Sequence, residues 1–239
     1  MSRGCSEMRL FTVSFLLFLM ISTSYGNCPD GDIASDSITP LTELKTLYDK
    51  IKNSEPAMCH PLIEQLDYVK VKYWGFDEKE HVGILLIHNE LSQDILEIFK
   101  SLFKYHYPIE KMQSPSATHI DDDILMANNV TGAFSCREVT GQPGILSQHS
   151  YGRAIDINPL INPYVKGDLI IPPAGKQFIA RDKSHRAKIT RDSLIYRLFT
   201  ERGWDWGGHW YELADYQHFE KRANDELRNR NGYPKKAVS

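Results

Sequence analysis

The sequence has little excess charge, few cysteines and no apolar run as long as a membrane-spanning helix. Its 239 residues carry a formal net charge of −3, so an extended basic surface for nucleic acid is not expected. Charged residues make up 25% of the chain, which is ordinary for a globular protein and excludes a mainly disordered one. The length fits one domain, and no internal repeat is present. We therefore expect a soluble monomer that has no nucleic-acid partner.

The N-terminal residues have the pattern of a secretory signal peptide. Two arginines precede the apolar run Leu10–Ile21, and small residues precede a cut after Gly26. The run is shorter than the ~20 apolar residues that a permanent membrane helix needs. We expect residues 1–26 to be removed, which gives an exported protein, periplasmic or secreted, with no stable membrane span.

The cysteines fit an oxidising compartment. Cys5 would leave with the signal peptide, whereas Cys28, Cys59 and Cys136 would remain. Because the remaining number is odd, at most one disulfide can form within the chain. We predict a bridge from Cys28 to Cys59, since both precede the expected core; the alternative is three buried thiols. Lipid attachment to Cys28 is disfavoured, because Asn27 is not the small residue that usually precedes a lipid-bearing cysteine.

Hydrophobic spacing predicts a mixed α and β domain behind an N-terminal extension. Residues 27–66 contain apolar residues at helical spacing after the start signal Thr39-Pro40, so we expect a helical extension. Residues 68–74 and 81–88 have the composition of two strands, which a turn would join as a hairpin. An amphipathic helix is expected over residues 90–106, because apolar side chains recur there every three or four positions.

The remaining elements are expected to be shorter. In chain order they are a loop over residues 114–132, strands over 133–137 and 152–158, an irregular connection over 159–188, and a helix that Thr190 caps and Gly203 ends. The acidic run Asp121–Asp123 is expected on solvated surface; the alternative is weak binding of calcium. The domain would then cover residues 67–220, followed by a charged tail at 221–239.

The densest group of residues that can do chemistry is Ser147-x-His149-x-x-Gly152-x-Ala154-x-Asp156, followed far downstream by Asp215-x-x-His218. A catalytic zinc ion commonly takes three protein ligands and leaves one position for water. His149, Asp156 and His218 supply that set for one zinc ion. Gly152 would let the backbone turn sharply, and the small Ala154 would leave room beside the metal. Any one of these residues alone is usually an ordinary surface or hydrogen-bonded residue, so the prediction depends on the combination.

A zinc hydrolase also needs a base for the water and a cation for the developing oxyanion. Asp215 lies three residues before a predicted ligand and is our candidate base. Arg137, on the strand expected before the motif, is the candidate cation. Ser147 and Tyr151 could brace the motif loop or bind the substrate. His209 lies near tryptophans that could line a groove or be buried, and is a third candidate for substrate binding.

These motifs resemble those of the zinc D-alanyl-D-alanine carboxypeptidases of the VanY and VanX type, a family that includes phage endolysins cutting between L-Ala and D-Glu. The resemblance covers most of residues 68–220. It rests on Tyr73–Asp77, Phe99 and Pro108–Met112, Phe134–Arg137, Ser147–Pro159, Gly203–Gly208 and Asp215–Glu220. One departure is Ser135, where similar sequences often have Asn. Residues 27–66 are not covered.

The resemblance implies a small α+β fold shared with the hedgehog signalling domain, in which helices pack on a mostly antiparallel sheet. It also implies zinc on the three predicted ligands, Asp215 as the base, and Arg137 as the group that binds the substrate carbonyl or carboxylate.

Peptidoglycan stem peptides would be the substrate, and D-Ala-D-Ala carboxypeptidase action is favoured. One alternative is cleavage of the L-Ala–D-Glu bond by an endopeptidase. Another is a non-catalytic zinc module that binds cell-wall peptide or a protein, against which the presence of Asp215 argues.

Overall fold

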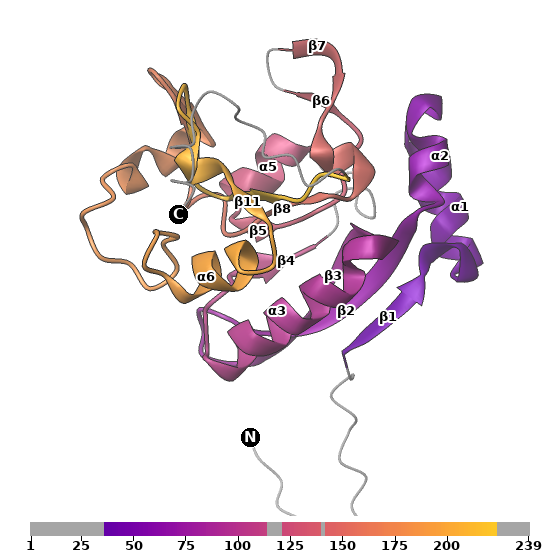
Figure 1. The fold of residues 1–239 in the computed structure, drawn as a ribbon, viewed down its shortest axis with the longest axis horizontal. Coiled ribbons are helices and arrows are strands. Elements are labelled where there is room, and N and C mark those ends of the chain that lie inside the picture. Colours follow the sequence, from indigo (N-terminus) through magenta and orange to yellow (C-terminus); the bar gives the residue numbers. More distant parts are fainter. Residues whose placement is uncertain (1–35, 114–120, 140–141, 224–239) are drawn as a thin grey trace, which may run out of the picture. The chain divides into compact units, whose positions relative to one another are not determined.

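The computed structural model describes residues 36–113, 121–139 and 142–223. The expected signal peptide, Cys28 and nearly all of the tail at 221–239 lie outside the described residues. No helix within the described part is long and apolar enough to cross a membrane. Small, mostly antiparallel sheets combine with a few helices, which agrees with the predicted α+β class (Figure 1).

The predicted hairpin forms the centre of the first sheet. β2 (Leu66–Trp74) pairs antiparallel with β3 (Glu80–His88) along its whole length. The 3-10 turn η3 (Asn89–Leu91) then leads into α3 (Ser92–Lys104), which packs along β2 (Figure 1). The predicted hairpin and amphipathic helix are therefore confirmed.

The N-terminal segment is not purely helical, so that prediction is wrong in part. β1 (Ser37–Pro40) contains the supposed helix start and pairs antiparallel with β2. Helical structure follows in η1 (Leu41–Glu43), α1 (Lys45–Ser54), η2 (Ala57–Cys59) and α2 (His60–Ile63). These turns bury a small apolar cluster against the hairpin, made of Leu41, Ile51, Ile63, Leu66, Leu86 and Phe134. The segment thus completes the sheet.

Two further three-stranded sheets carry the second half of the chain. In one, β13 (His218–Glu220) lies between β11 (Asp205–Trp206) and β8 (Ala154–Asp156). In the other, β9 lies between β10 and β12. Its strands are β9 (Tyr164–Lys166), β10 (Leu169–Ile171) and β12 (Ala214–Asp215). The connection predicted to be irregular therefore contains two strands, and also η5 (Pro173–Phe178).

One apolar core links the first sheet to the strand that carries His218. The stripe of α3 is buried, and α6 (Leu194–Thr200) packs against the same helix. Phe199 of α6 stacks on Phe219 of β13 with ring centroids 4.2 Å apart. Both rings are fully buried, and each such burial contributes about 1.5–3 kcal/mol. The position of β13 is therefore fixed from behind by the core.

Three local predictions in this half are wrong. Residues 133–137 form no strand; the nearby pairs are β4 (Lys111–Met112) with β5 (Val130–Thr131), and β6 (Glu138–Val139) with β7 (Gln142–Leu146). The expected loop contains α5 (Asp122–Ala127), whose first turn is the acidic run and whose N-cap is Asp121. α6 begins after Ser193, whose Oγ accepts from the backbone of Tyr196. Gly203, at φ +79°, follows the helix end as predicted.

The disulfide joins Cys59 to Cys136, so the predicted partner of Cys59 is wrong. The bridge ties the end of η2 to the segment that precedes β6, across a sequence separation of 77 residues. Cys136 lies next to Arg137, and the backbone of neighbouring Ser135 donates to His149 O at 3.3 Å. The bridge thus holds the segment that borders the predicted metal ligand.

Replacing both Cys59 and Cys136 by Ser is expected to lower the free energy of unfolding by roughly 4 kcal/mol, because a loop of this length is then unrestrained in the unfolded chain. Urea denaturation of the oxidised proteins measures the change. Cys28→Ser, which leaves the bridge intact, is the matched control. Equal midpoints for the double variant and the control would contradict the prediction.

Candidate metal centre

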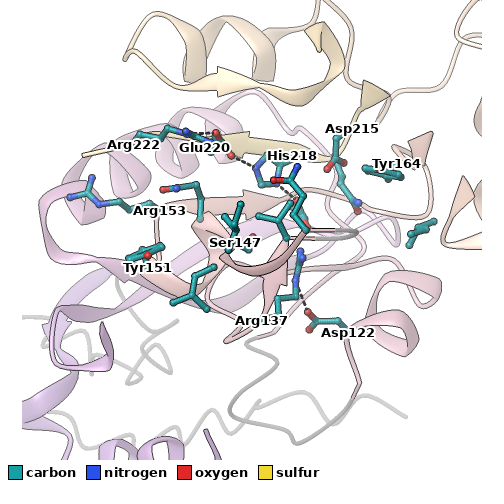
Figure 2. Close-up of a pocket in the computed structure, with 18 of the residues that line it drawn as sticks. Asp122, Arg137, Ser147, Tyr151, Arg153, Tyr164, Asp215, His218, Glu220 and Arg222 are labelled. Atoms are coloured by element: carbon teal, nitrogen blue, oxygen red, sulfur yellow. Dashed lines mark hydrogen bonds and ion pairs between the residues drawn. The ribbon is translucent and has the colours of Figure 1, made fainter. Parts of the chain in front are cut away.

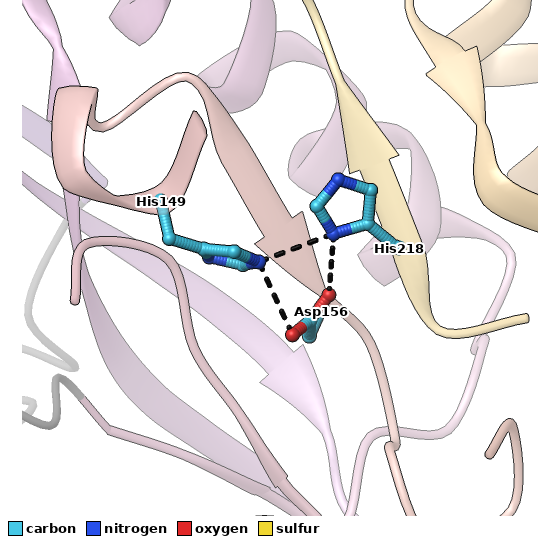
Figure 3. A group of neighbouring side chains, drawn as sticks. All are labelled: His149, Asp156 and His218. Carbon is cyan, nitrogen blue, oxygen red and sulfur yellow. Dashed lines mark hydrogen bonds and ion pairs between the residues drawn. The ribbon is translucent and has the colours of Figure 1, made fainter. Parts of the chain in front are cut away.

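The three predicted ligands meet at one point, although they come from different elements. His149 lies in η4 (Gln148–Tyr151), Asp156 ends β8, and His218 begins β13 directly opposite Asp156. His149 Nε2 is 3.1 Å from His218 Nδ1 and 3.2 Å from Asp156 Oδ2, and His218 Nδ1 is 3.0 Å from Asp156 Oδ1 (Figure 3). One ligand atom from each residue lies within 4.8 Å of the others. Two imidazoles and a carboxylate that converge in this way could hold a metal ion.

The outward-facing nitrogen of each imidazole is occupied, which leaves the inward one to bind a metal. His149 Nδ1 lies 2.6 Å from the carbonyl oxygen of Ala133 and donates to it. His218 Nε2 donates to Glu220 Oε2 at 3.0 Å. Such partners fix the tautomer and the ring orientation of a ligand histidine. The donor set therefore fits a metal, both in its chemistry and in its outer hydrogen bonds.

The charges of Asp156, His218 and Glu220 stabilise the arrangement of these three side chains. Burial alone would raise the pKa of Asp156, but His149 and His218 outweigh it and hold that pKa well below its usual range. Burial would lower the pKa of His218, yet hydrogen bonds to Asp156 and Glu220 raise it to about 10. The pKa of Glu220 falls to about 2, because His218 and Arg222 overcome the effect of burial. A metal that binds here must displace the proton on His218 Nδ1, since a ligand histidine is neutral.

Gly152 fulfils the structural role predicted for it. It ends η4 with φ +64°, a conformation that side chains rarely adopt. A Cβ at this position would lie 2.4 Å from Leu66 Cδ2 and 2.7 Å from His88 N. At the other end of the turn, Ser147 Oγ accepts from His149 N at 3.3 Å. A capped turn and a close approach to β3 thus place His149 over β8.

Asp215 lies on the wall of a cavity of about 740 Å³ that also exposes Asp156 and His218 (Figure 2). It is 9% exposed and ends β12, and its negative charge contributes to the raised pKa of His218. A Cβ on Gly207 would lie only 2.7 Å from Asp215 Cβ, so a glycine is needed for this close approach. Asp215 is therefore near the metal centre without being one of the three converging side chains.

Arg137 also lines this cavity, at the end nearer α5. Its Nε lies 3.1 Å from Asp122 Oδ2, and Ser135 Oγ donates to the same oxygen at 2.7 Å. Its backbone N donates to Ser150 Oγ at 2.9 Å. Asp122 is thus an ion-pair partner rather than simply a solvated residue, and Ser135 helps to hold it.

The three candidates for substrate binding have different surroundings. Ser147 and Tyr151 line the cavity. His209 instead packs against the rings of Tyr196 and Trp206, at centroid distances of 5.3 and 5.0 Å. Burial, with a smaller effect of a nearby arginine, lowers the pKa of His209 to about 4. The neighbouring tryptophans at 204, 206 and 210 are buried as well, which makes them supporting residues rather than groove residues.

Two charged residues of this site have no role assigned to them from the sequence: Glu220, which accepts from His218, and Arg222, whose Nε donates to Glu220 Oε1 at 2.9 Å. The spacing of Glu220 was a usable signal, since residues two apart on a strand share a face. Ala154 lies opposite Glu220 on β8, so its small side chain leaves room for this carboxylate.

Glu220→Gln is expected to weaken metal binding by about 10- to 100-fold, because the buried amide cannot stabilise the ligand histidine as a carboxylate does. Competition with a chromophoric chelator, with Zn²⁺ as the probe ion, measures the affinity. Glu212→Gln, at an exposed position, is the matched control. An unchanged affinity in Glu220→Gln would show that the hydrogen bond to His218 does not support the ligand.

Residues 140–221 match the family model described as D-alanyl-D-alanine carboxypeptidase. This segment contains the three converging side chains and Asp215, whereas Arg137 precedes it. Searches of curated proteins and of solved structures gave no match. Over residues 140–221 the chain is similar to the D-alanyl-D-alanine carboxypeptidase family, which confirms the resemblance predicted from the sequence.

Proposed function

We propose that this protein is an exported zinc peptidase that hydrolyses bacterial cell-wall peptides, with the terminal D-Ala–D-Ala bond as its substrate. The observation that carries the proposal is the convergence of His149, Asp156 and His218. Two of these residues, Asp156 and His218, line a cavity together with Asp215. The family match over the same residues supports a peptidase. We also propose the hedgehog type of α+β fold and action as a monomer.

Each residue of the site has a separate role in hydrolysis. A bound zinc ion would supply Lewis acidity and make a water molecule acidic enough to lose a proton near neutral pH. Asp215 accepts that proton as the water attacks, and then donates it to the departing amine. Arg137 donates hydrogen bonds to the carbonyl oxygen as negative charge develops there. His149, Asp156 and His218 would hold the metal, and Ala133 and Glu220 fix the orientations of the two imidazoles.

Arg137 fits its role because, among the residues that the structure describes, Asp122 alone contacts its guanidinium. Asp122 contacts Nε and is a member of the same cavity wall. The guanidinium is planar and offers several donors, so one edge can face Asp122 while another faces the substrate. Asp122 therefore acts as a positioning residue for Arg137.

The test is to measure the zinc content of the mature protein and the release of D-Ala from a stem pentapeptide. One zinc per chain, D-Ala release, loss of release with a chelator and recovery with zinc are expected. If zinc is bound but no D-Ala appears, mass analysis of digested muropeptides decides between the alternatives. A new L-Ala–D-Glu cleavage would identify an endopeptidase, and intact muropeptides would identify a binding module. A protein that binds no zinc would overturn the proposal.

A further inference from the structure

Three arginines line the cavity, and they differ in how much of each guanidinium is already used. Arg153 has a side chain that is only 7% exposed; it pairs with Glu90 and points a second nitrogen at the carbonyl of Lys221. Arg137 belongs to the machinery proposed above. Arg222 has a side chain that is 31% exposed, and its contact with Glu220 uses Nε. No other acceptor contacts Arg222 among the described residues.

Glu220 connects Arg222 to the metal centre. One carboxylate oxygen accepts from His218 Nε2 at 3.0 Å, and the other accepts from Arg222 Nε at 2.9 Å. Since Glu220 is 3% exposed and sits on β13, it holds Arg222 at a fixed place relative to His218. The arginine is thus a preorganised cation beside the site, not a freely moving surface side chain.

Within the described part of the chain, the two terminal nitrogens of Arg222 remain for an outside partner. A guanidinium that uses Nε for one carboxylate can bind a second carboxylate through its other edge, often with two parallel hydrogen bonds. In Figure 2, Arg222, Arg153 and Tyr151 lie on one side of His218, whereas Asp215 and Tyr164 lie on the other. A peptide whose carbonyl lies at the metal centre can therefore extend toward Arg222 without displacing Asp215.

We propose that Arg222, held by Glu220, binds a carboxylate of the peptide substrate and makes the cavity selective for acidic peptides. Tyr151, which lines the cavity on the same side of His218 as Arg222 (Figure 2), offers a hydroxyl as a second donor. This inference rests on the proposed peptidase function. The carboxylate could be the C-terminal one of the stem peptide or the free one of its D-Glu residue.

Substrates that differ only in charge test the proposal. Three stem peptides are compared: the unmodified peptide, one with a C-terminal amide, and one with D-Gln in place of D-Glu. For the wild type, neutralising the recognised carboxylate is expected to lower kcat/KM about 10- to 100-fold, the effect of losing a hydrogen bond between charged groups. For Arg222→Gln, the kcat/KM of the unmodified peptide is expected to be lower than that of the wild type by the same factor, and neutralising the carboxylate is expected to lower it no further. The recognised carboxylate is the one whose neutralisation lowers kcat/KM for the wild type but not for Arg222→Gln.

Binding provides a readout that does not depend on hydrolysis. Calorimetric titration of the same peptides into zinc-loaded Asp215→Asn, with and without Arg222→Gln, is expected to give the same loss of discrimination. Arg197→Gln, an exposed arginine on α6, is the control for charge, and its discrimination is expected to match the wild type. Discrimination in binding without any hydrolysis would overturn the proposed function but support this inference.

Two results would overturn the inference. The first is that Arg222→Gln lowers cleavage and binding equally for all three peptides, because Arg222 would then act only by holding Glu220. The second is that the wild type does not distinguish charged from neutral peptides. Zinc affinity, measured for each variant, separates the first result from simple loss of the metal. Arg222→Lys keeps the charge but not the planar edge, and partial recovery of discrimination is expected from it.

Discussion

Asp215→Asn is expected to keep one zinc ion and to lower kcat by about 100- to 10,000-fold, the range that general acid–base catalysis contributes. Asn has nearly the same size as Asp, so the packing of Gly207 against this residue is retained. It cannot accept a proton from water, however, or return one to a leaving amine. Because Asp215 is not one of the three converging side chains, metal affinity is expected to change little.

The measurement pairs zinc content with single-turnover release of D-Ala. Asp168→Asn, an exposed residue of the β9–β10 hairpin, is the matched control and is expected to behave as the wild type. Loss of zinc together with loss of activity would make Asp215 a ligand, and retained activity would remove it from the mechanism. A lower melting temperature in the variant would indicate that its defect is structural.

Long periodic segments were the part of the fold that the sequence analysis predicted well. The hairpin of β2 and β3 and the helix α3 have enough residues for their spacing to decide between strand and helix. Strands of two to four residues, such as β1 and β12, have no period to detect. Their existence depends on a partner strand, and pairing is a tertiary property.

The ligand set could be predicted because His and Asp are residue types that bind zinc. The sequence does not show that the three residues lie close together. His149 and Asp156 are close in sequence, whereas His218 reaches them only through the pairing of β13 with β8. The partner of Cys59 was missed for the same reason: Cys136 is 77 residues away, and nothing local indicates that the two segments touch. Glu220 lies in the motif Asp215–Glu220, but the motif does not reveal that this carboxylate accepts a hydrogen bond from His218.

Two roles are expected for Arg137 from the sequence, binding the substrate carbonyl or binding a substrate carboxylate. The kinetics of an Arg137 variant distinguish them. If the arginine stabilises the developing oxyanion, Arg137→Gln is expected to lower kcat by about 100- to 1,000-fold with a small change in KM. If it binds a carboxylate of the bound substrate, KM is expected to rise while kcat is retained. We expect the first result, because Arg222 offers a separate, preorganised partner for a carboxylate.

A variant of Asp122, the ion-pair partner of Arg137, serves as a control because it changes the position of the guanidinium and leaves its charge unchanged. Asp122→Asn removes the negative partner of Arg137 Nε but keeps a side chain of the same size for Ser135 to contact. A smaller loss of kcat than in Arg137→Gln is expected, since the guanidinium remains but is held less firmly. Steady-state kinetics on the stem pentapeptide, with zinc content measured for each variant, distinguish these cases. Equal losses in both variants would mean that Arg137 acts only as one half of an ion pair that shapes the cavity wall, and its assignment to the oxyanion would then be wrong.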